Sequence, residues 1–271
     1  MSSSSFEVPT VHVIQDSREF VERFAEDVVL AREWFAAEEK GGGDWEFVTR
    51  TSEGVDVWRQ AVPDAPGLYM WLTHGPIQVD AAVFAKVYND LDYRRQWDDY
   101  ALDLRKVSDL RDGEEDLDLK SELPKEVIPS DDTSYDGGIL YWSAKYPWPM
   151  WNRDYVFYRG VESDPETGIT VAINRGGATD EVPEDAGNQV RVDTYFSLLV
   201  AQPWDPKKQD DLVDRVGADA AGQGKWTDAF MMTFDDPKGN IPSSLVSYGV
   251  KKGLSSFQAK LTAACNSYPN A

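Results

Sequence analysis

The residues of this 271-residue chain that are best suited to a defined chemical task are Arg94 and Asp98. They lie four positions apart in the segment DLDYRRQWDDY, so on a helical turn they share a face and can pair. If the pair is exposed, it contributes only about 0.3–0.5 kcal/mol. If it is buried, Asp98 instead orients a planar guanidinium that can receive an anion. The spacing alone leaves both interpretations open.

A second group of candidate residues is aromatic and lies in the stretch 139–159, ILYWSAKYPWPMWNRDYVFYR. Apolar and aromatic residues alternate at 139–142 and 154–158, which predicts two strands joined by a Pro-rich loop. Aromatic side chains on both faces of these strands indicate one of two arrangements. Either protein covers both faces of the sheet, or one face lines a cavity for an apolar ligand.

Residues for covalent or metal chemistry are scarce. The two histidines, His12 and His74, show no metal-ligand spacing, and the chain has no GxSxG, P-loop or GxGxxG motif. The single cysteine, Cys265, excludes an internal disulfide and a Cys-based zinc site, and its place in an apolar helical stripe predicts an inert core thiol. We therefore expect a protein that is not an enzyme and that has no cofactor and no metal site.

The charge distribution limits the partners. The net charge of −21 argues against nucleic-acid binding, which depends on neutralising phosphates. The segment 238–271 carries four lysines and no acidic residue, so the rest of the chain, at −21 less this +4, carries −25. This basic end predicts a surface that faces something negative. No secretory signal and no apolar run of about 20 residues is present, which favours a soluble, cytoplasmic protein.

The elements that must position these residues follow from periodicity and turn signals. We expect helices at 16–39, capped by Asp16, after Asp80, and at 241–268. Strands are expected at 44–50, 55–61, 68–73 (ended by Gly75-Pro76), 102–109, 139–142, 154–158, 168–174, 189–200 and 223–234. The acidic stretch 111–138 is expected to form a surface loop, partly disordered, and 205–221 a polar, partly helical connection.

Four motifs in this order resemble the START lipid-transfer family, and most of all its phosphatidylcholine-transferring branch. They are DLDYRRQWDDY (90–100), YWSAKYPWPMWNRDYVFYR (141–159), RVDTY (191–195) and FDDPKGNIPSSL (234–245). The resemblance covers residues 44–268 and implies an α+β helix-grip fold, in which a curved antiparallel sheet wraps around a long C-terminal helix and encloses a lipid tunnel. We expect a flexible N-terminus, 1–15, and a single START domain, 16–271, with an acidic insertion at 111–138.

The resemblance also implies roles for individual residues. Arg94 would contact the lipid phosphate and Asp98 would hold Arg94, while Tyr88 matches a further headgroup-contacting position. The choline cage would consist of Trp142, Tyr155 and Tyr195. Aromatic ring faces suit choline because a quaternary ammonium cannot donate strong N–H hydrogen bonds. Ser197 departs from the family pattern, since the most similar members carry an amide side chain near the lipid at that position.

The function implied is a monomeric, non-enzymatic carrier that binds phosphatidylcholine or a related phospholipid and contacts membranes transiently. The alternative is a START-type phospholipid sensor that acts through a protein partner, with the acidic insertion as a docking loop. A helix-grip enzyme is a third possibility, which the missing catalytic constellation disfavours.

A closed lipid tunnel needs an element that opens, and the sequence offers two. One is the loop 146–152 with Trp148, Met150 and Trp151, because tryptophan suits the membrane interface. The other is the C-terminal helix, where Lys251 and Lys252 can approach phosphate headgroups and Gly253 can allow a bend. In the competing interpretation the tryptophans pack inward and the lysines only keep the helix soluble.

Overall fold

The computed structural model describes residues 12–37, 44–182, 189–239 and 243–269, with only the backbone described for residues 243–252 and 254. The helices are α1 (Ser17–Ala36), α2 (Ala81–Asn89), α3 (Leu91–Trp97), α4 (Leu119–Glu122), η1 (Pro206–Lys208), α5 (Gln209–Val216), α6 (Ala218–Ala221) and α7 (Ser243–Asn266). The strands are β1 (Glu46–Arg50), β2 (Asp56–Ala61), β3 (Tyr69–Ile77), β4 (Ala101–Ser108), β5 (Arg111–Asp112), β6 (Glu115–Asp116), β7 (Ser134–Ala144), β8 (Asn152–Ser163), β9 (Thr170–Gly176), β10 (Gln189–Val192), β11 (Tyr195–Pro203) and β12 (Thr227–Asp235).

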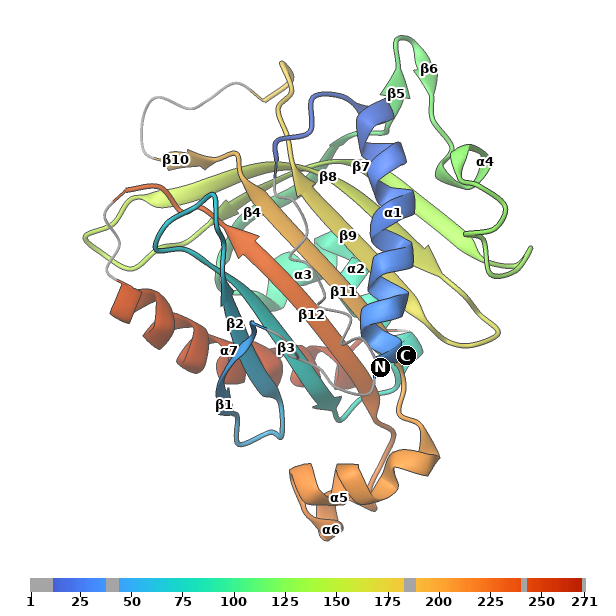
Figure 1. The fold of residues 1–271 in the computed structure, drawn as a ribbon, viewed down its shortest axis with the longest axis vertical. Helices are drawn as coiled ribbons and strands as arrows, with labels where there is room; N and C mark the ends of the chain where they lie inside the picture. Colours follow the sequence, from blue (N-terminus) through green and yellow to red (C-terminus); the bar gives the residue numbers. More distant parts are fainter. Residues whose placement is uncertain (1–11, 38–43, 183–188, 240–242, 270–271) are drawn as a thin grey trace.

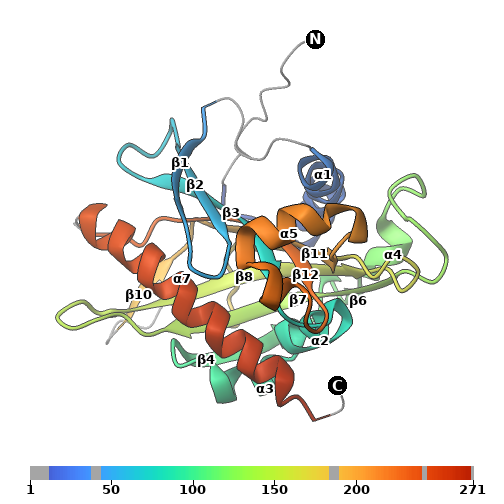
Figure 2. The same cartoon turned by 90° about the horizontal axis from the view of Figure 1, so that it is seen from below.

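A large curved sheet organises the molecule (Figure 1). Its strand order is β1-β2-β3-β12-β11-β9-β8-β7-β4, and neighbours along this path are antiparallel. Helix α1 lies on one face of the sheet, called the outer face here, and α2, α3 and α7 lie on the other, the inner face (Figures 1 and 2). The expected α+β helix-grip fold is confirmed, whereas the enclosed tunnel remains a prediction.

Apolar packing and one buried ion pair attach α1 to the outer face. Asp16 caps the helix as expected, because its side chain accepts a hydrogen bond from the Glu19 amide. Asp27 accepts two hydrogen bonds from Arg175 of β9, at 2.6 and 2.7 Å. A Cβ atom on Gly160 would lie 2.4 Å from the ring of Phe24, so glycine is required for this close approach.

The central strand, β8, has buried side chains on both of its faces. Its residues from Arg153 to Glu162 are buried, and their side chains alternate between two clusters. Val156 and Tyr158 join the outer-face core with α1, whereas Tyr155 and Phe157 join an inner-face cluster. Even-numbered positions of β8 therefore stabilise the fold, and odd-numbered positions face the helices of the inner side.

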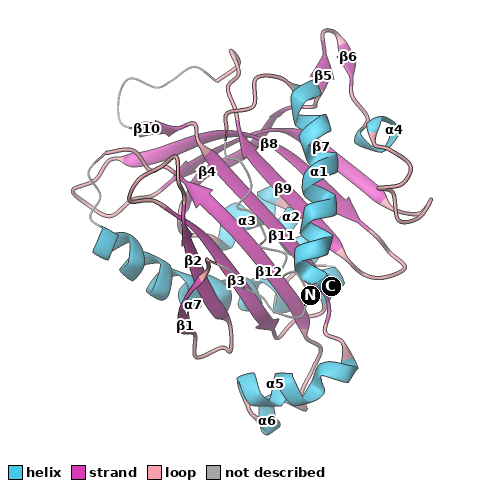
Figure 3. Ribbon diagram, in the orientation of Figure 1, coloured by secondary structure: helices cyan, strands magenta, loops and turns pink. Residues whose placement is uncertain are grey.

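The prediction of a partly disordered loop over 111–138 is wrong. The segment forms the β5–β6 hairpin and α4, and its last residues begin β7 (Figure 3). Leu119, Leu123 and Val127 are buried in the outer-face core. Leu119 lies in α4, Leu123 follows its last residue and Val127 lies in the turn beyond, and burial of these three side chains outweighs the acidic composition of the segment.

Several strand boundaries also differ from expectation, and two of the differences follow from the strand pairing. The single strand expected at 189–200 is two strands: β10 pairs in parallel with β8 from Asn152 to Tyr155, and β11 pairs with β9 and β12. The 12-residue β8 is longer than the seven-residue β9, so β10 pairs with the part of β8 that β9 leaves free. β3 does not end at Gly75-Pro76 but reaches Ile77, because β12 still pairs with it beyond the end of β2.

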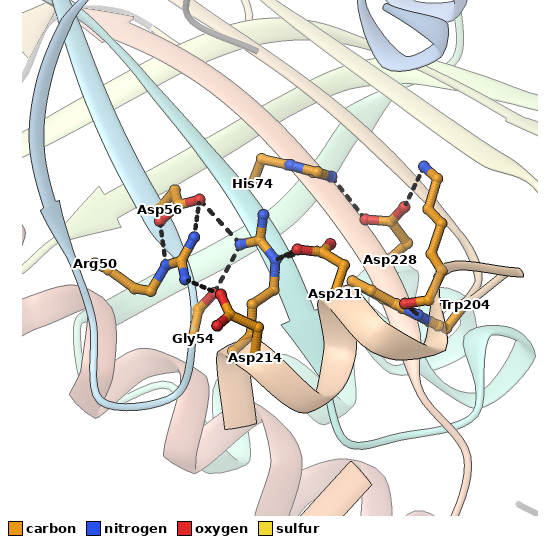
Figure 4. Close-up of polar contacts among 10 residues, drawn as sticks. Arg50, Gly54, Asp56, His74, Trp204, Asp211, Asp214 and Asp228 are labelled. Carbon is orange, nitrogen blue, oxygen red and sulfur yellow. Dashed lines mark hydrogen bonds and ion pairs between the residues drawn. The ribbon is translucent and has the colours of Figure 1, made fainter. Parts of the chain in front are cut away.

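The connection at 205–221 is helical, as expected in part, and a polar network attaches it to the sheet (Figure 4). Arg215 of α5 donates from Nη1 to Asp56 Oδ2 and to the Gly54 carbonyl, both at 3.0 Å. Asp56 also accepts a hydrogen bond from Arg50 Nε at 2.7 Å. Beside this network, the buried His74 Nε2 lies 2.8 Å from Asp228 Oδ1. These contacts lie outside the inner-face cluster; they attach α5 to β2 and link β3 to β12.

The C-terminal half of α7 is fixed to α2, α3 and the sheet. Tyr93 donates to the Ala264 carbonyl at 3.0 Å, and Tyr268 donates to Asp90 at 2.9 Å, where Asp90 also caps α3. Gln258 donates to the Pro76 carbonyl at 3.1 Å. No helix in the described ranges is both long and apolar enough to cross a membrane.

Candidate functional site

Arg94 and Asp98 form the expected pair, and the pair is shielded from solvent. Arg94 Nε donates to Asp98 Oδ2 at 3.1 Å, with side chains 15% and 4% exposed. The second oxygen of Asp98 accepts a hydrogen bond from the Tyr100 amide at 3.1 Å, which fixes the carboxylate at the end of α3. Burial opposes the charge of Arg94, but Tyr88 and Asp98 outweigh burial and raise its pKa. The interpretation as an exposed helix pair is therefore wrong.

A second arginine, Arg159, joins this pair at the ring of Tyr88. The guanidinium carbons of Arg94 and Arg159 lie 5.3 and 5.4 Å from the centre of that ring. Arg159 is buried and donates to Asn89 Oδ1, and no carboxylate pairs with it in the described part of the chain. Burial lowers the pKa of Arg159, and the charge of Arg94 acts in the same direction. Two cations therefore converge on one ring with a single aspartate to balance them.

The three aromatic residues expected to form a cage do lie together on the inner face. Trp142 and Tyr155 stack with ring centroids 4.8 Å apart, and Tyr195 meets Tyr155 edge-on at 5.4 Å. Rings stacked at this distance leave no gap for a trimethylammonium group between them. A bound ammonium group would therefore contact ring edges and outer faces, unless Trp142 rotates.

The structure places a carboxylate, Asp235, in this aromatic group. It lies directly opposite Tyr195 in the β11–β12 pairing, and its Oδ2 accepts a hydrogen bond from the Tyr155 hydroxyl at 2.9 Å. Burial raises the pKa of Asp235, and the neighbouring Asp236 adds to this effect. Burial also raises the pKa of Tyr155 well above its ordinary value. The aromatic site thus contains a carboxyl group whose surroundings disfavour its charged form.

Sequence reasoning missed Arg159, Asp235 and Asn174 as site residues. Arg159 has the same odd-numbered alternation along β8 as Tyr155, which is the signal that places both on one face. Asn174 lies directly opposite Ser197, and its Oδ1 is buried without a hydrogen-bond partner among the described residues. An amide is therefore present one strand away from the position where the family resemblance led us to expect it.

The tryptophans of the expected gate face outward. Trp148 and Trp151 are 92% and 56% exposed, so the interpretation in which they pack inward is wrong. Arg153, at the base of this loop, donates from Nε to the Pro237 carbonyl at 2.7 Å and from Nη2 to the Lys238 carbonyl at 3.0 Å. The loop is therefore tied to the segment that leads into α7.

The remaining residues of the expected gate are described less completely. Met150 is partly buried. The side chains of Lys251 and Lys252 lie outside the described part of the chain. A Cβ atom on Gly253 would meet none of the described atoms within 4 Å, so close packing does not require glycine there. The gating roles of these residues remain predictions.

Comparison with known proteins places this geometry in a family. The family model described as START domain matches residues 30–270. Phosphatidylcholine transfer protein from Mus musculus is 30% identical over 232 residues, covering 84% of this chain and 86% of that protein. StAR-related lipid transfer protein 7, mitochondrial, from Mus musculus is 28% identical over 219 residues, covering 80% of this chain and 48% of that protein.

Solved structures show the same fold. Human StAR-related lipid transfer protein 5 superposes with a TM-score of 0.61 at 15% identity, over 93% of this chain and 99% of that one. Human STARD10 superposes with a TM-score of 0.59 at 18% identity, over 97% of this chain and 84% of that one. Since the family model matches most of the sequence, the chain belongs to the START domain family.

Proposed function

We propose that this protein is a non-enzymatic, cytoplasmic carrier that binds one phospholipid, phosphatidylcholine foremost, and moves it between membranes. The observation that carries the proposal is the pair of guanidinium groups, Arg94 and Arg159, at the ring of Tyr88. A phosphodiester supplies the negative charge that these two cations lack, and arginine presents a planar fork to phosphate oxygens.

The other parts of the lipid have complementary neighbours on the inner face. The aromatic group of Trp142, Tyr155 and Tyr195 would receive choline, since ring faces attract quaternary ammonium ions by about 0.5–2 kcal/mol per ring. The unpartnered amide oxygen of Asn174 would face the glycerol region or an ordered water. The acyl chains would extend beneath α7. The relatives named phosphatidylcholine transfer protein support this choice of lipid.

Membrane exchange is assigned to the loop with Trp148 and to the first half of α7. The exposed tryptophans would enter the interface, and Lys251 and Lys252 would contact anionic headgroups. The charge of −25 on the rest of the chain would turn this end of the molecule toward the bilayer.

The test combines lipid identification with transfer. Native mass spectrometry of the purified protein should detect one phosphatidylcholine per chain, and the loaded protein should deliver it from donor to acceptor vesicles. Binding without delivery would instead favour the alternative function, a lipid sensor that acts through a protein partner. If no choline lipid is bound even after incubation with phosphatidylcholine vesicles, the proposal is wrong.

A further inference from the structure

Asp235, which is partly buried, differs from the buried Asp98 because it has no cationic partner among the described residues. Asp98 is paired with Arg94. Within the described ranges, Asp235 accepts one hydrogen bond, from Tyr155, and takes part in no ion pair. The neighbouring Asp236 differs again, because Lys238 approaches it at 3.5 Å. A carboxylate held among aromatic rings without a cation costs free energy, so a positively charged ligand would stabilise its charged form.

The charge of Arg153 reaches Asp235, but the two side chains form no ion pair. Arg153 affects the charge state of Asp235, but all three of its guanidinium nitrogens donate to main-chain carbonyls. These carbonyls belong to Trp151, Pro237 and Lys238. Arg153 thus holds the loop in place, and the second oxygen of Asp235 accepts no hydrogen bond from the described residues.

The two unbalanced charges of the inner face have opposite signs and different neighbours. The positive one, Arg159, lies with Arg94 at Tyr88. The negative one, Asp235, lies at Tyr155 and Tyr195. Tyr195 is affected by both groups. Burial is the main cause that raises the pKa of Tyr195, while the charge of Arg94 lowers that pKa and Asp235 raises it. The site thus has a positive end and an acidic end.

We propose that Asp235 is the counter-charge for the ammonium group of a bound phospholipid, so that the site selects zwitterionic headgroups over anionic ones. This inference rests on the proposed function and extends it, because the choline site becomes electrostatic as well as aromatic. A carboxylate attracts choline and primary ammonium headgroups alike. Phosphatidylethanolamine should therefore also be bound, and phosphatidylglycerol should be rejected.

The direct test replaces charge without changing shape. Asp235→Asn keeps an acceptor for the Tyr155 hydroxyl but removes the negative charge. Asp236→Asn makes the same chemical change one position away and serves as the matched control. Both variants and the wild type are loaded from vesicles that contain equal amounts of phosphatidylcholine and phosphatidylglycerol, and the bound lipids are quantified by native mass spectrometry. The bound choline-to-glycerol ratio should fall about tenfold in Asp235→Asn, as expected for loss of a desolvated charge pair, and stay unchanged in Asp236→Asn.

The outcomes separate the inference from the proposed function. If the wild type carries phosphatidylcholine and Asp235→Asn keeps the wild-type ratio, Asp235 is not the counter-charge, although the carrier function stands. If the wild type carries no choline lipid, the proposed function itself is wrong and the inference falls with it. Asp235→Glu retains the charge and should preserve the preference for zwitterionic lipids.

A measurement on the wild type keeps the inference testable if the Asn variant does not fold. The carboxyl carbon of Asp235 can be followed by ¹³C NMR through a pH titration of protein loaded with phosphatidylcholine or with phosphatidylglycerol. The ionisable groups around it are Tyr146, Tyr155, Tyr195, Asp236 and Arg153. A bound ammonium favours the charged carboxylate, so the pKa of Asp235 should be lower with phosphatidylcholine. Equal pKa values with the two lipids would overturn the inference.

Discussion

Arg159 donates its hydrogen bond to the amide oxygen of Asn89 and not to a carboxylate. An amide satisfies a donor but cannot neutralise a guanidinium, so the buried charge of Arg159 stays unbalanced. Arg175, which is also buried, is different because Asp27 accepts two of its hydrogen bonds. This contrast between two buried arginines on neighbouring strands allows ligand binding to be separated from stability.

Replacing Arg159 with Met should weaken phosphatidylcholine binding by tenfold or more while leaving the lipid-free protein at least as stable. The reason is that the substitution removes a buried charge that costs free energy in the absence of an anion. Arg175→Met is the control. It leaves the buried Asp27 without its arginine partner and should lower the free energy of unfolding by about 3–5 kcal/mol. Urea denaturation and vesicle loading measure the two effects. Equal destabilisation by both changes, with normal lipid loading in Arg159→Met, would contradict the assignment.

The Arg94–Asp98 pair should respond differently to the loss of each partner. Arg94→Ala should abolish phosphatidylcholine capture because the guanidinium is the proposed phosphate donor. Asp98→Ala should cost about 3–5 kcal/mol of stability, since it leaves a buried cation and an unpaired Tyr100 amide. Asp98→Asn keeps an acceptor for that amide and should cost less. Vesicle transfer and chemical denaturation check these expectations, and unchanged transfer by a folded Arg94→Ala variant would exclude the phosphate role.

Trp142→Ala should weaken phosphatidylcholine binding more than phosphatidylethanolamine binding, because a primary ammonium keeps N–H donors for hydrogen bonds. One ring contributes about 0.5–2 kcal/mol, so the ratio of the two affinities should shift by about 2- to 30-fold. Tyr155→Ala should act in the same direction but also frees Asp235. Tyr141→Ala is the control, since Tyr141 belongs to the outer-face core. Loss of both lipids in equal measure would remove the cage from the mechanism.

The exposed loop should matter for transfer and not for folding. Trp148→Ser should leave the free energy of unfolding within about 0.5 kcal/mol of wild type, because the side chain is 92% exposed. Transfer should nevertheless slow, since the ring no longer enters the membrane interface. Phe47→Ser, at a 55% exposed position of β1, is the control and should transfer normally.

The same gate predicts an electrostatic and a conformational effect in α7. Lys251→Glu combined with Lys252→Glu should slow transfer to anionic vesicles more than to neutral ones, because each lysine contributes about 1 kcal/mol to binding at an anionic membrane.

Gly253→Ala should stabilise the helix by about 1 kcal/mol and slow lipid exchange if the helix bends there. A disulfide that tethers the loop 146–152 to α7 should block exchange reversibly. Normal exchange by the tethered protein would place the gate elsewhere.

Cys265 should be inert near neutral pH because burial raises the pKa of its thiol to about 11. The thiolate is the reactive form, so a thiol reagent at pH 8 should modify the unfolded chain quickly and the native chain hardly at all. The folded state holds this proton to higher pH than the unfolded state does. Its contribution to stability is therefore present below about pH 9 and is lost as the pH rises toward 11. Rapid native modification at pH 8 would contradict this.

The sequence by itself determined the elements and the local pair. Apolar periodicity located α1 and α7, and alternation located β7 and β8, since both patterns depend only on the geometry of one segment. The i, i+4 spacing of Arg94 and Asp98 likewise predicted their hydrogen bond. The family motifs carried the identification of the fold, which the START match over 30–270 confirms.

Only the tertiary structure decided which charges remain without partners. Tyr155 and Asp235 are separated by 80 positions in the chain, and Arg159 and Asn89 by 70. Their meeting depends on the strand order and on the register of β11 with β12, which no local pattern contains. For the same reason the buried residues Leu119, Leu123 and Val127 could be recognised only once α1 and the outer face supplied a surface to bury them. Burial of a charge is a property of all the elements around it, so the charge pattern of the site emerges with the fold.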